Sequence, residues 1–367
     1  MPTVADVVAY LDRFAPPVLA AEWDNVGLLA GDPALPANRI LTCLTITSDV
    51  VEEAIAERVE LIVSHHPVMF RGVKKLTPQS PDGRVLPPLL RHGIAVYSPH
   101  TAFDNCPGGI NDGLARRLGL IDVQPLRKAM SKPECKLVVF VPDVDLAKVS
   151  DAMFAAGAGK IGQYEQCSFR VPGTGSFFGN DSTNPTVGVK GRRENVSEWR
   201  LEVVVPEKCV DAVIAAMRQS HSYEEPAFDV YPLRGKSTGG EGRIGQLAAP
   251  VPLSDLAKLT KAQLHANGVQ LVGDPGKLVQ SVAIACGAAG EFLPDAIAAQ
   301  ADVFLTGEIR FHDCQTAQAA NIAVILPGHY ATERPGIEDL AGQLAAAFPA
   351  TTVNASQRER DPLSWQL

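Results

Sequence analysis

Short runs of apolar residues alternate with segments of helical periodicity at both ends of this 367-residue chain. Near the start, the runs 40–46, 60–64 and 94–97 are separated by amphipathic segments. Continuous apolar strands that alternate with helices are typical of a parallel or mixed sheet layered with helices. The chain is therefore predicted to be α/β, with a three-layer, mixed-sheet core.

The same alternation of apolar runs and helical segments returns near the end of the chain, where 282–285, 303–305 and 323–326 are predicted strands. The middle differs, because its predicted elements follow the order strand, helix, strand, strand, helix, strand, which is the ferredoxin-like pattern. We therefore expect residues 131–238 to form an inserted α+β domain. Residues 1–130 and 239–367 would then build the core together.

Composition narrows the classes of function. A net charge of −8 argues against a non-specific nucleic-acid binder, which usually presents a basic face. Seven cysteines without a C-x-x-C pair indicate reduced, mostly buried thiols in a reducing compartment. Neither a signal peptide nor an apolar stretch of membrane-spanning length is visible. We expect a cytoplasmic protein that does not enter a membrane.

Two adjacent histidines, His65 and His66, follow the apolar run 60–64. Ligands of α/β proteins bind outside the carboxyl ends of such strands. Neighbouring residues of an extended strand point to opposite sides, so the two imidazoles suit two ions better than one. The alternative for this pair is a purely structural role.

A histidine and a carboxylate, His100 and Asp104, follow the next predicted strand, 94–97. This again places potential metal ligands at the carboxyl end of a strand. The alternative for Asp104 is that it caps the following turn.

A second pair, His329 and Glu333, follows the predicted strand 323–326. Residues four apart share one face of a helix, so this pair can converge if the turn is helical. Pro335 predicts that the regular helix begins only near Thr332, because proline is tolerated in a first turn. The alternative is a carboxylate that complements the helix dipole beside a solvent-facing histidine.

Three predicted strand ends thus deliver imidazole or carboxylate groups, the ligand set of zinc, iron or manganese. Together they predict a site for two divalent ions. Five side chains cannot fill two four-coordinate sites, so a bridging carboxylate and a bridging water are expected. Such a site keeps open positions for a substrate.

Six motifs, in this order along the chain, resemble those of the GTP cyclohydrolase 1 type 2 homologs, the Nif-three-like proteins. The motifs are Glu22-Trp23-Asp24-Asn25-Val26-Gly27-Leu28, Ser64-His65-His66-Pro67, His100-Thr101 with Asp104-Asn105, Gly109-x-Asn111-Asp112, Leu305-Thr306-Gly307-Glu308 and Gly328-His329-x-x-x-Glu333. They cover nearly the whole chain outside the predicted insert.

The resemblance implies a metal site and an assembly. The implied metal ligands, with Glu333 as the bridge, are His65, His66, Asp104, His329 and Glu333. The insert is similar to the PII-like or CutA-like module of the longer members. The family forms ring-shaped homohexamers whose metal sites face an internal cavity. Its name implies hydrolytic opening of the imidazole ring of GTP, so the expected partner is GTP, another nucleotide or a related small molecule.

One stretch departs from the family pattern. Members often carry Cys-Gly-Gly-Ser-Gly where this chain has Cys286-Gly287-Ala288-Ala289-Gly290. The small residues are kept but a hydroxyl is lost, so a side chain of this loop is not expected to bind substrate. A plain tight turn is the favoured interpretation.

Two further residues are candidates for catalysis. Glu308 would be a general base or a partner of a metal-bound histidine, and its alternative is a carboxylate that starts a helix. His100 would orient substrate or support Asp104, and its alternative is a satisfied structural histidine. His312 is expected to be structural.

The sequence leaves two classes of function open. The first is a metal-dependent hydrolase, in which metal-activated water attacks a nucleotide or a related substrate. The second is a non-enzymatic, metal-binding regulatory or scaffold protein. Nucleic-acid binding is disfavoured by the net negative charge.

Overall fold

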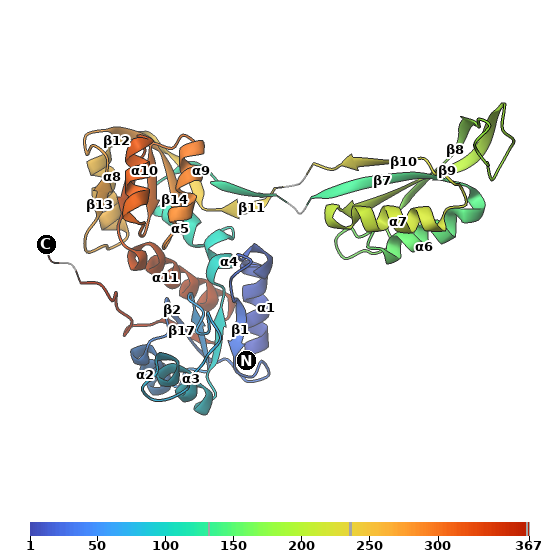
Figure 1. Ribbon diagram of the computed structural model, residues 1–367. Helices are drawn as coiled ribbons and strands as arrows, with labels where there is room; N and C mark the ends of the chain where they lie inside the picture. Colours follow the sequence, from blue (N-terminus) through green and yellow to red (C-terminus); the bar gives the residue numbers. More distant parts are fainter. Residues whose placement is uncertain (131–132, 235–236, 365, 367) are drawn as a thin grey trace. The chain divides into compact units, whose positions relative to one another are not determined.

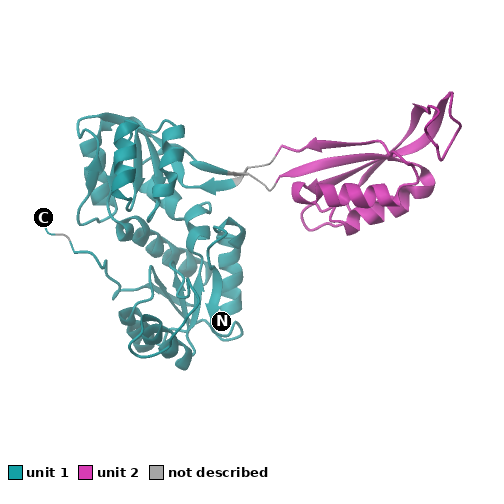
Figure 2. Cartoon of the chain, viewed as in Figure 1, with its two compact units in different colours: residues 1–129, 239–367 teal, residues 130–238 magenta. Residues whose placement is uncertain are grey.

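The computed structural model describes residues 1–130, 133–234, 237–364 and 366. The chain forms two compact units, which are residues 1–129 with 239–367, and residues 130–238 (Figure 2). Residue 131, the predicted first residue of the inserted domain, lies outside the described residues. No helix in the described part of the chain is both long and apolar enough to cross a membrane.

The first unit contains a five-stranded mixed sheet in the order β1-β4-β3-β2-β17 (Figure 1). Its strands are β1 (Gly27–Ala30), β2 (Arg39–Cys43), β3 (Leu61–Ser64), β4 (Ala95–Ser98) and β17 (Thr352–Ala355). β1 runs antiparallel to β4, and all other neighbours are parallel. Since β17 comes from the end of the chain, the two terminal regions share one sheet.

A second, six-stranded mixed sheet has the order β13-β16-β15-β14-β12-β5. Its strands are β5 (Ile121–Gln124), β12 (Arg243–Pro252), β13 (Gln270–Val272), β14 (Leu278–Ala285), β15 (Val303–Thr306) and β16 (Ala323–Leu326). β14, β15 and β16 are parallel, and the other neighbours are antiparallel. All four residues of β15 and of β16 are buried, as expected for strands covered on both faces.

Helices cover both faces of each sheet. They are α1 (Val4–Phe14), α2 (Ser48–Ala56), α3 (Pro81–Arg91), α4 (His100–Asn105), α5 (Ile110–Arg117), α8 (Leu253–Gln263), α9 (Leu293–Ala298), α10 (Phe311–Ala319) and α11 (His329–Ala347). Helices α2 and α3 pack on one face of the first sheet, and α9 and α10 on one face of the second. The prediction of an α/β core with mixed sheets is confirmed, and the core holds two such sheets.

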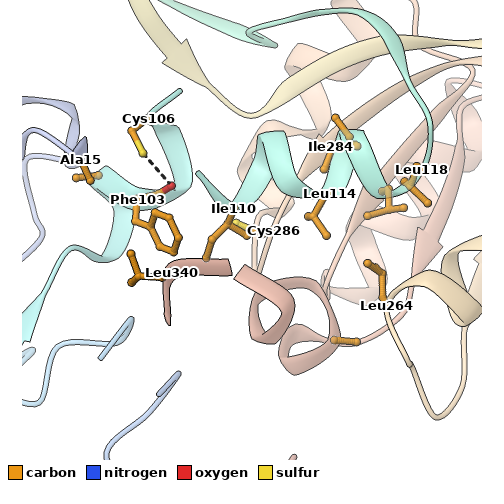
Figure 3. Close-up of a cluster of buried hydrophobic side chains, with 14 of the residues drawn as sticks. Ala15, Phe103, Cys106, Ile110, Leu114, Leu118, Leu264, Ile284, Cys286 and Leu340 are labelled. Carbon is orange, nitrogen blue, oxygen red and sulfur yellow. Dashed lines mark hydrogen bonds between the residues drawn. The ribbon is translucent and has the colours of Figure 1, made fainter. Parts of the chain in front are cut away.

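The largest apolar cluster fills the space between the two sheets, where α1, α4, α5, α8 and α11 meet. Figure 3 shows part of this cluster along α5, with Ile110 and Leu114 beside Cys286 and Ile284. Leu114 is 1% exposed and Ile284 is fully buried. The cluster therefore fixes the ends of both sheets against one another through a shared helical layer.

Local sequence signals explain where some helices begin. Thr3 caps α1, because its side chain accepts a hydrogen bond from Asp6 N at 3.2 Å and the Asp6 carboxylate accepts from Thr3 N at 2.8 Å. Helix α11 begins at His329, and the prediction of a start near Thr332 is wrong. Gly328, with φ of 104°, allows the sharp entry into the helix, and Thr332 N already donates to Gly328 O at 3.2 Å.

The second unit is a four-stranded antiparallel sheet in the order β10-β7-β9-β8. Its elements follow the chain as β7 (Glu134–Val141), α6 (Leu146–Ala155), β8 (Phe169–Phe178), β9 (Arg193–Pro206), α7 (Val210–Ser220) and β10 (Phe228–Pro232). Both helices pack on one face of the sheet around a separate apolar cluster. The unit thus has its own core.

The remaining elements are short. Strands β6 (Arg127–Met130) and β11 (Ser237–Glu241) form a two-stranded ribbon. The single-turn 3₁₀ helices are η1 (Pro17–Leu19), η2 (Asp143–Asp145), η3 (Glu207–Cys209) and η4 (Gly290–Phe292).

Candidate metal centre

The carboxyl ends of parallel strands from both sheets meet at one place in the first unit. His65 and His66 directly follow β3, and Asp104 lies on α4, the short helix after β4. His329 and Glu333 lie one turn apart at the start of α11, which follows β16. The structure therefore brings together all five residues that the sequence predicts as metal ligands, from segments up to 268 positions apart.

The Glu333 carboxylate lies at the centre of this cluster. Its Oε2 is 3.1 Å from His66 Nε2 and 3.0 Å from His329 Nε2. Its Oε1 is 3.9 Å from His65 Nε2, which in turn is 3.5 Å from Asp104 Oδ1. The two oxygens of one carboxylate thus face two different sets of side chains, as a bridging ligand does.

Several polar atoms of the cluster are buried without a hydrogen-bond partner among the described residues. They are both ring nitrogens of His65, His329 Nε2 and Glu333 Oε2. Buried polar groups are nearly always satisfied, because an unmet donor or acceptor costs about 1–3 kcal/mol. Nitrogen and oxygen atoms that converge without hydrogen bonds are what divalent cations bind, so these residues fit a metal.

Protonation in the metal-free protein supports the same interpretation for His65. Burial holds its pKa well below the usual value, so the ring stays neutral and keeps the lone pair that a metal requires. Burial also opposes ionisation of Glu333, but the neighbouring imidazoles of His329 and His66 outweigh it and hold the pKa of this carboxyl below its usual range. His65 and Glu333 thus keep metal-competent forms at neutral pH.

Two other members of the cluster carry raised pKa values. Burial, together with the neighbouring Glu333 charge, raises the pKa of Asp104 to about 7. Burial alone would lower the pKa of His329, but the Glu333 and Glu308 carboxylates outweigh it and raise the pKa to about 9. A cation that binds here must displace protons from these two groups.

Outer partners orient the cluster. Thr45 Oγ1 is 2.7 Å from His66 Nδ1, and Glu308 Oε1 is 3.0 Å from His329 Nδ1. Asp104 Oδ1 accepts a hydrogen bond from the Cys286 thiol at 3.1 Å. Such contacts fix the ring that faces a metal and the nitrogen that carries the proton. Sequence reasoning named Glu308 for this position and missed Thr45, which no motif marked.

His100 lies beside the tandem histidines, with its ring centroid 5.1 Å from that of His65 and 5.6 Å from that of His66. Its Nδ1 is 2.7 Å from Asp24 Oδ1, and Thr101 Oγ1 donates to Asp24 Oδ2 at 2.5 Å. The Thr101 N–H also donates to Asp24 Oδ2, at 3.2 Å. The positive φ of His100, 30°, adds backbone strain at this point.

Two glycines make room for the cluster. A Cβ at Gly287 would lie 2.2 Å from Glu333 Oε1, and a Cβ at Gly307 would lie 2.7 Å from His329 Cα. Gly287 also has a φ of 67°, a conformation that favours glycine. The Cys286 to Gly290 stretch is therefore a close backbone approach to the carboxylate. His312, by contrast, is exposed on α10 and contacts Gln315 Oε1 at 3.1 Å.

Comparison with known proteins places the chain in a described group. The model of the Duf34/NIF3 (NGG1p interacting factor 3) family matches residues 2–362. A Bacillus subtilis protein named GTP cyclohydrolase 1 type 2 homolog is 38% identical over 326 residues, which cover 89% of this chain and 87% of that protein. A Halalkalibacterium halodurans protein of the same name is 36% identical over 363 residues, 98% of each chain.

Solved structures show the same likeness along the whole chain. A Bacillus cereus protein related to NIF3 is 32% identical, with a TM-score of 0.69, and the match covers 100% of this chain and 99% of that one. A Staphylococcus aureus protein is 27% identical, with a TM-score of 0.74 and the same coverage.

Proposed function

This chain belongs to the Duf34/NIF3 family, and on that premise we propose that its imidazole and carboxylate cluster holds two divalent cations and hydrolyses a nucleotide or a related small molecule. The name shared by its relatives, GTP cyclohydrolase 1 type 2 homolog, supports a nucleotide such as GTP as the substrate. Zinc, iron and manganese all suit the ligand set.

The position of Glu333 carries this proposal. One of its oxygens faces His66 and His329, and the other faces His65, so the carboxylate divides the cluster into two halves. In the proposal, His65, Asp104 and Glu333 would hold one cation, and His66, His329 and Glu333 would hold the other. A pair of divalent cations supplies a Lewis acid and a water of lowered pKa when bound.

In the proposal, two residues outside the ligand set have further roles: one orients a ligand, and the other moves a proton. Glu308 accepts a hydrogen bond from the protonated Nδ1 of His329 at 3.0 Å, which leaves Nε2 free to act as a ligand. Asp24 holds His100 in the same way, at 2.7 Å from its Nδ1. In the proposal His100 therefore presents Nε2 to the substrate and moves a proton during hydrolysis.

In the proposal, the second unit is a separate domain whose role is not metal binding. Its element order and its strand order, β10-β7-β9-β8, support a ferredoxin-like domain of the PII or CutA kind. Its described residues carry none of the proposed ligands. The family resemblance further supports assembly into a homohexamer, which light scattering of the purified chain would test.

Metal analysis and an activity screen test the function together. The His329→Ala variant should lose bound metal, whereas His312→Ala, a matched change of an exposed histidine, should keep the metal content of the wild type. Equal metal content in the two variants would contradict the site.

The wild type should also hydrolyse a substrate in a panel of GTP, other nucleotides and phosphoesters, at a rate that follows its metal content. Metal binding without turnover of any compound would instead favour a regulatory or scaffold protein.

A further inference from the structure

Two large aromatic side chains are left exposed beside the candidate metal centre. Trp23 is 60% exposed and Phe70 is 46% exposed. Their ring centroids are 5.7 Å apart at an interplanar angle of 69°. Both rings also approach His100, at 6.1 Å for Trp23 and 6.3 Å for Phe70. The aromatic pair is therefore continuous with the histidines of the cluster.

The chain holds this pair in place through polar neighbours. Asp24, whose side chain is fully buried, accepts hydrogen bonds from His100 and Thr101. Asn25 Nδ2 donates to Met69 O at 2.6 Å and so ties the loop of Trp23 to the loop of Phe70. The backbone on both sides is anchored while the rings stay in solvent, which is the arrangement of a binding surface.

A group of cations follows Phe70 directly in the chain. Arg71, Lys74 and Lys75 are exposed, and none of them forms an ion pair with another described residue. Three free cations within five positions contrast with the net charge of −8 of the whole chain. They favour a ligand that carries negative charge, since complementary charge steers and holds such a ligand.

We propose that Trp23 and Phe70 form an aromatic platform on which the planar ring of a nucleotide-class substrate stacks, next to the metal centre. The phosphates of that substrate are held by Arg71, Lys74 and Lys75. Stacking of one base on an aromatic side chain changes affinity by about tenfold to a hundredfold. The inference deepens the proposed function, because it assigns the residues that select the ring and the charge of the substrate.

Three probes distinguish the aromatic part of this surface from its cationic part. Calorimetry on the metal-loaded full chain measures the affinity for each probe. The probes are GTP, guanosine and inorganic tripolyphosphate. The Trp23→Ala variant should weaken GTP and guanosine binding about tenfold or more and leave tripolyphosphate within about twofold. Phe70→Ala should act in the same direction, without touching the residue beside Asp24. A Lys74→Ala/Lys75→Ala double variant should weaken GTP and tripolyphosphate and spare guanosine.

Leu278→Ala is the matched control. Leu278 is 64% exposed and begins β14, whose other end leads to Cys286 at the site. Because the eight residues of β14 separate the two, Leu278 lies about 25 Å from Cys286. This variant should bind all three probes as the wild type does.

Three results would overturn the proposal of an aromatic platform. They are wild-type affinity for guanosine and GTP in both aromatic variants, no binding of any probe to the wild type, and a changed oligomeric state with unchanged affinities. The last result would assign the aromatic surface to a second copy of the chain. Metal content and turnover, measured in the same variants, keep the test of the platform separate from the test of the proposed function. A metal-loaded, active Trp23→Ala protein with normal affinity refutes only the platform, and a metal-free wild type refutes the metal centre.

Discussion

Two buried histidines, one in each unit, show what separates a structural imidazole from a candidate ligand. His221 in the second unit is 8% exposed, and both of its ring nitrogens are satisfied: Nε2 lies 3.0 Å from Phe140 O, and Nδ1 accepts from Tyr223 N at 3.0 Å. His65 in the first unit is fully buried, and neither ring nitrogen has a partner among the described residues. Both rings are therefore buried, but only the ring of His221 is hydrogen-bonded.

His65 thus retains a free-energy cost of unmet hydrogen bonding that His221 avoids. An unsatisfied buried polar group destabilises a fold, so such groups persist where a bound partner or a function compensates. His65 lies beside Asp104 and Glu333, which also face the cluster. Changes at His65 should therefore affect metal binding, and changes at His221 should affect stability.

The largest expected effect is on metal content. His65→Ala should remove at least one of the two proposed ions, because it deletes the nitrogen nearest to Asp104. His221→Ala should leave metal content unchanged, since its ring is already hydrogen-bonded. Elemental analysis of both purified variants checks this, and metal loss from His221→Ala alone would reverse the comparison.

The second expected effect is on the stability of the second unit. His221→Ala leaves Phe140 O and Tyr223 N without their partners and opens a small cavity. The free energy of unfolding of this unit should fall by about 2–4 kcal/mol. Denaturant unfolding of the full chain, followed by hydrogen exchange in each unit, measures it. An unchanged free energy of unfolding would mean that the two hydrogen bonds contribute nothing to the stability of this unit.

A third effect is the pH dependence of metal affinity. His329 has a pKa of about 9 and Asp104 a pKa of about 7 in the metal-free protein, so both bind protons at pH 6. A cation must displace these protons, so affinity should rise with pH until about 9, by about a hundredfold between pH 6 and 8 from the His329 proton alone. Calorimetry in buffers of different ionisation enthalpy would count the released protons. Affinity that is flat over this range would contradict the assignment.

The smallest expected effect is at Thr45. Thr45→Val keeps the shape of the side chain but removes the contact of Oγ1 with His66 Nδ1. Metal affinity should fall about tenfold, as for other partners of metal-bound histidines. Thr47→Val is the control, because Thr47 caps α2 and does not contact the cluster. Equal metal affinities in the two variants would show that Thr45 does not orient the ring.

Local patterns predicted much of the fold. The predicted strands 303–305 and 323–326 match β15 and β16 of the structure. The pairing of β17 with β2 was not predictable, because it joins residues about 310 positions apart. The start of α11 was mispredicted because Pro335 dominated the pattern, whereas the backbone of Gly328 decided the entry.

The candidate site, like the fold, was predictable from the sequence only in part. Strand ends that carry His65, Asp104 and His329 are visible in the sequence, because the carboxyl ends of parallel strands gather at one edge. The contacts that orient these residues are not, since Thr45 and Asp24 reach their histidines only after the strands are placed. Which oxygen of Glu333 faces which imidazole likewise depends on the packing of α11.

The number of cations bound per chain is the sharpest test of a centre that Glu333 divides between two ions. Elemental analysis or native mass spectrometry of the wild type, loaded with excess zinc or manganese and then desalted, should give two ions per chain. Glu333→Gln, which weakens the shared carboxylate while keeping its shape, should retain at most one. A wild type that holds a single ion at saturation, or a Glu333→Gln variant that still holds two with unchanged affinity, would contradict a centre divided by Glu333.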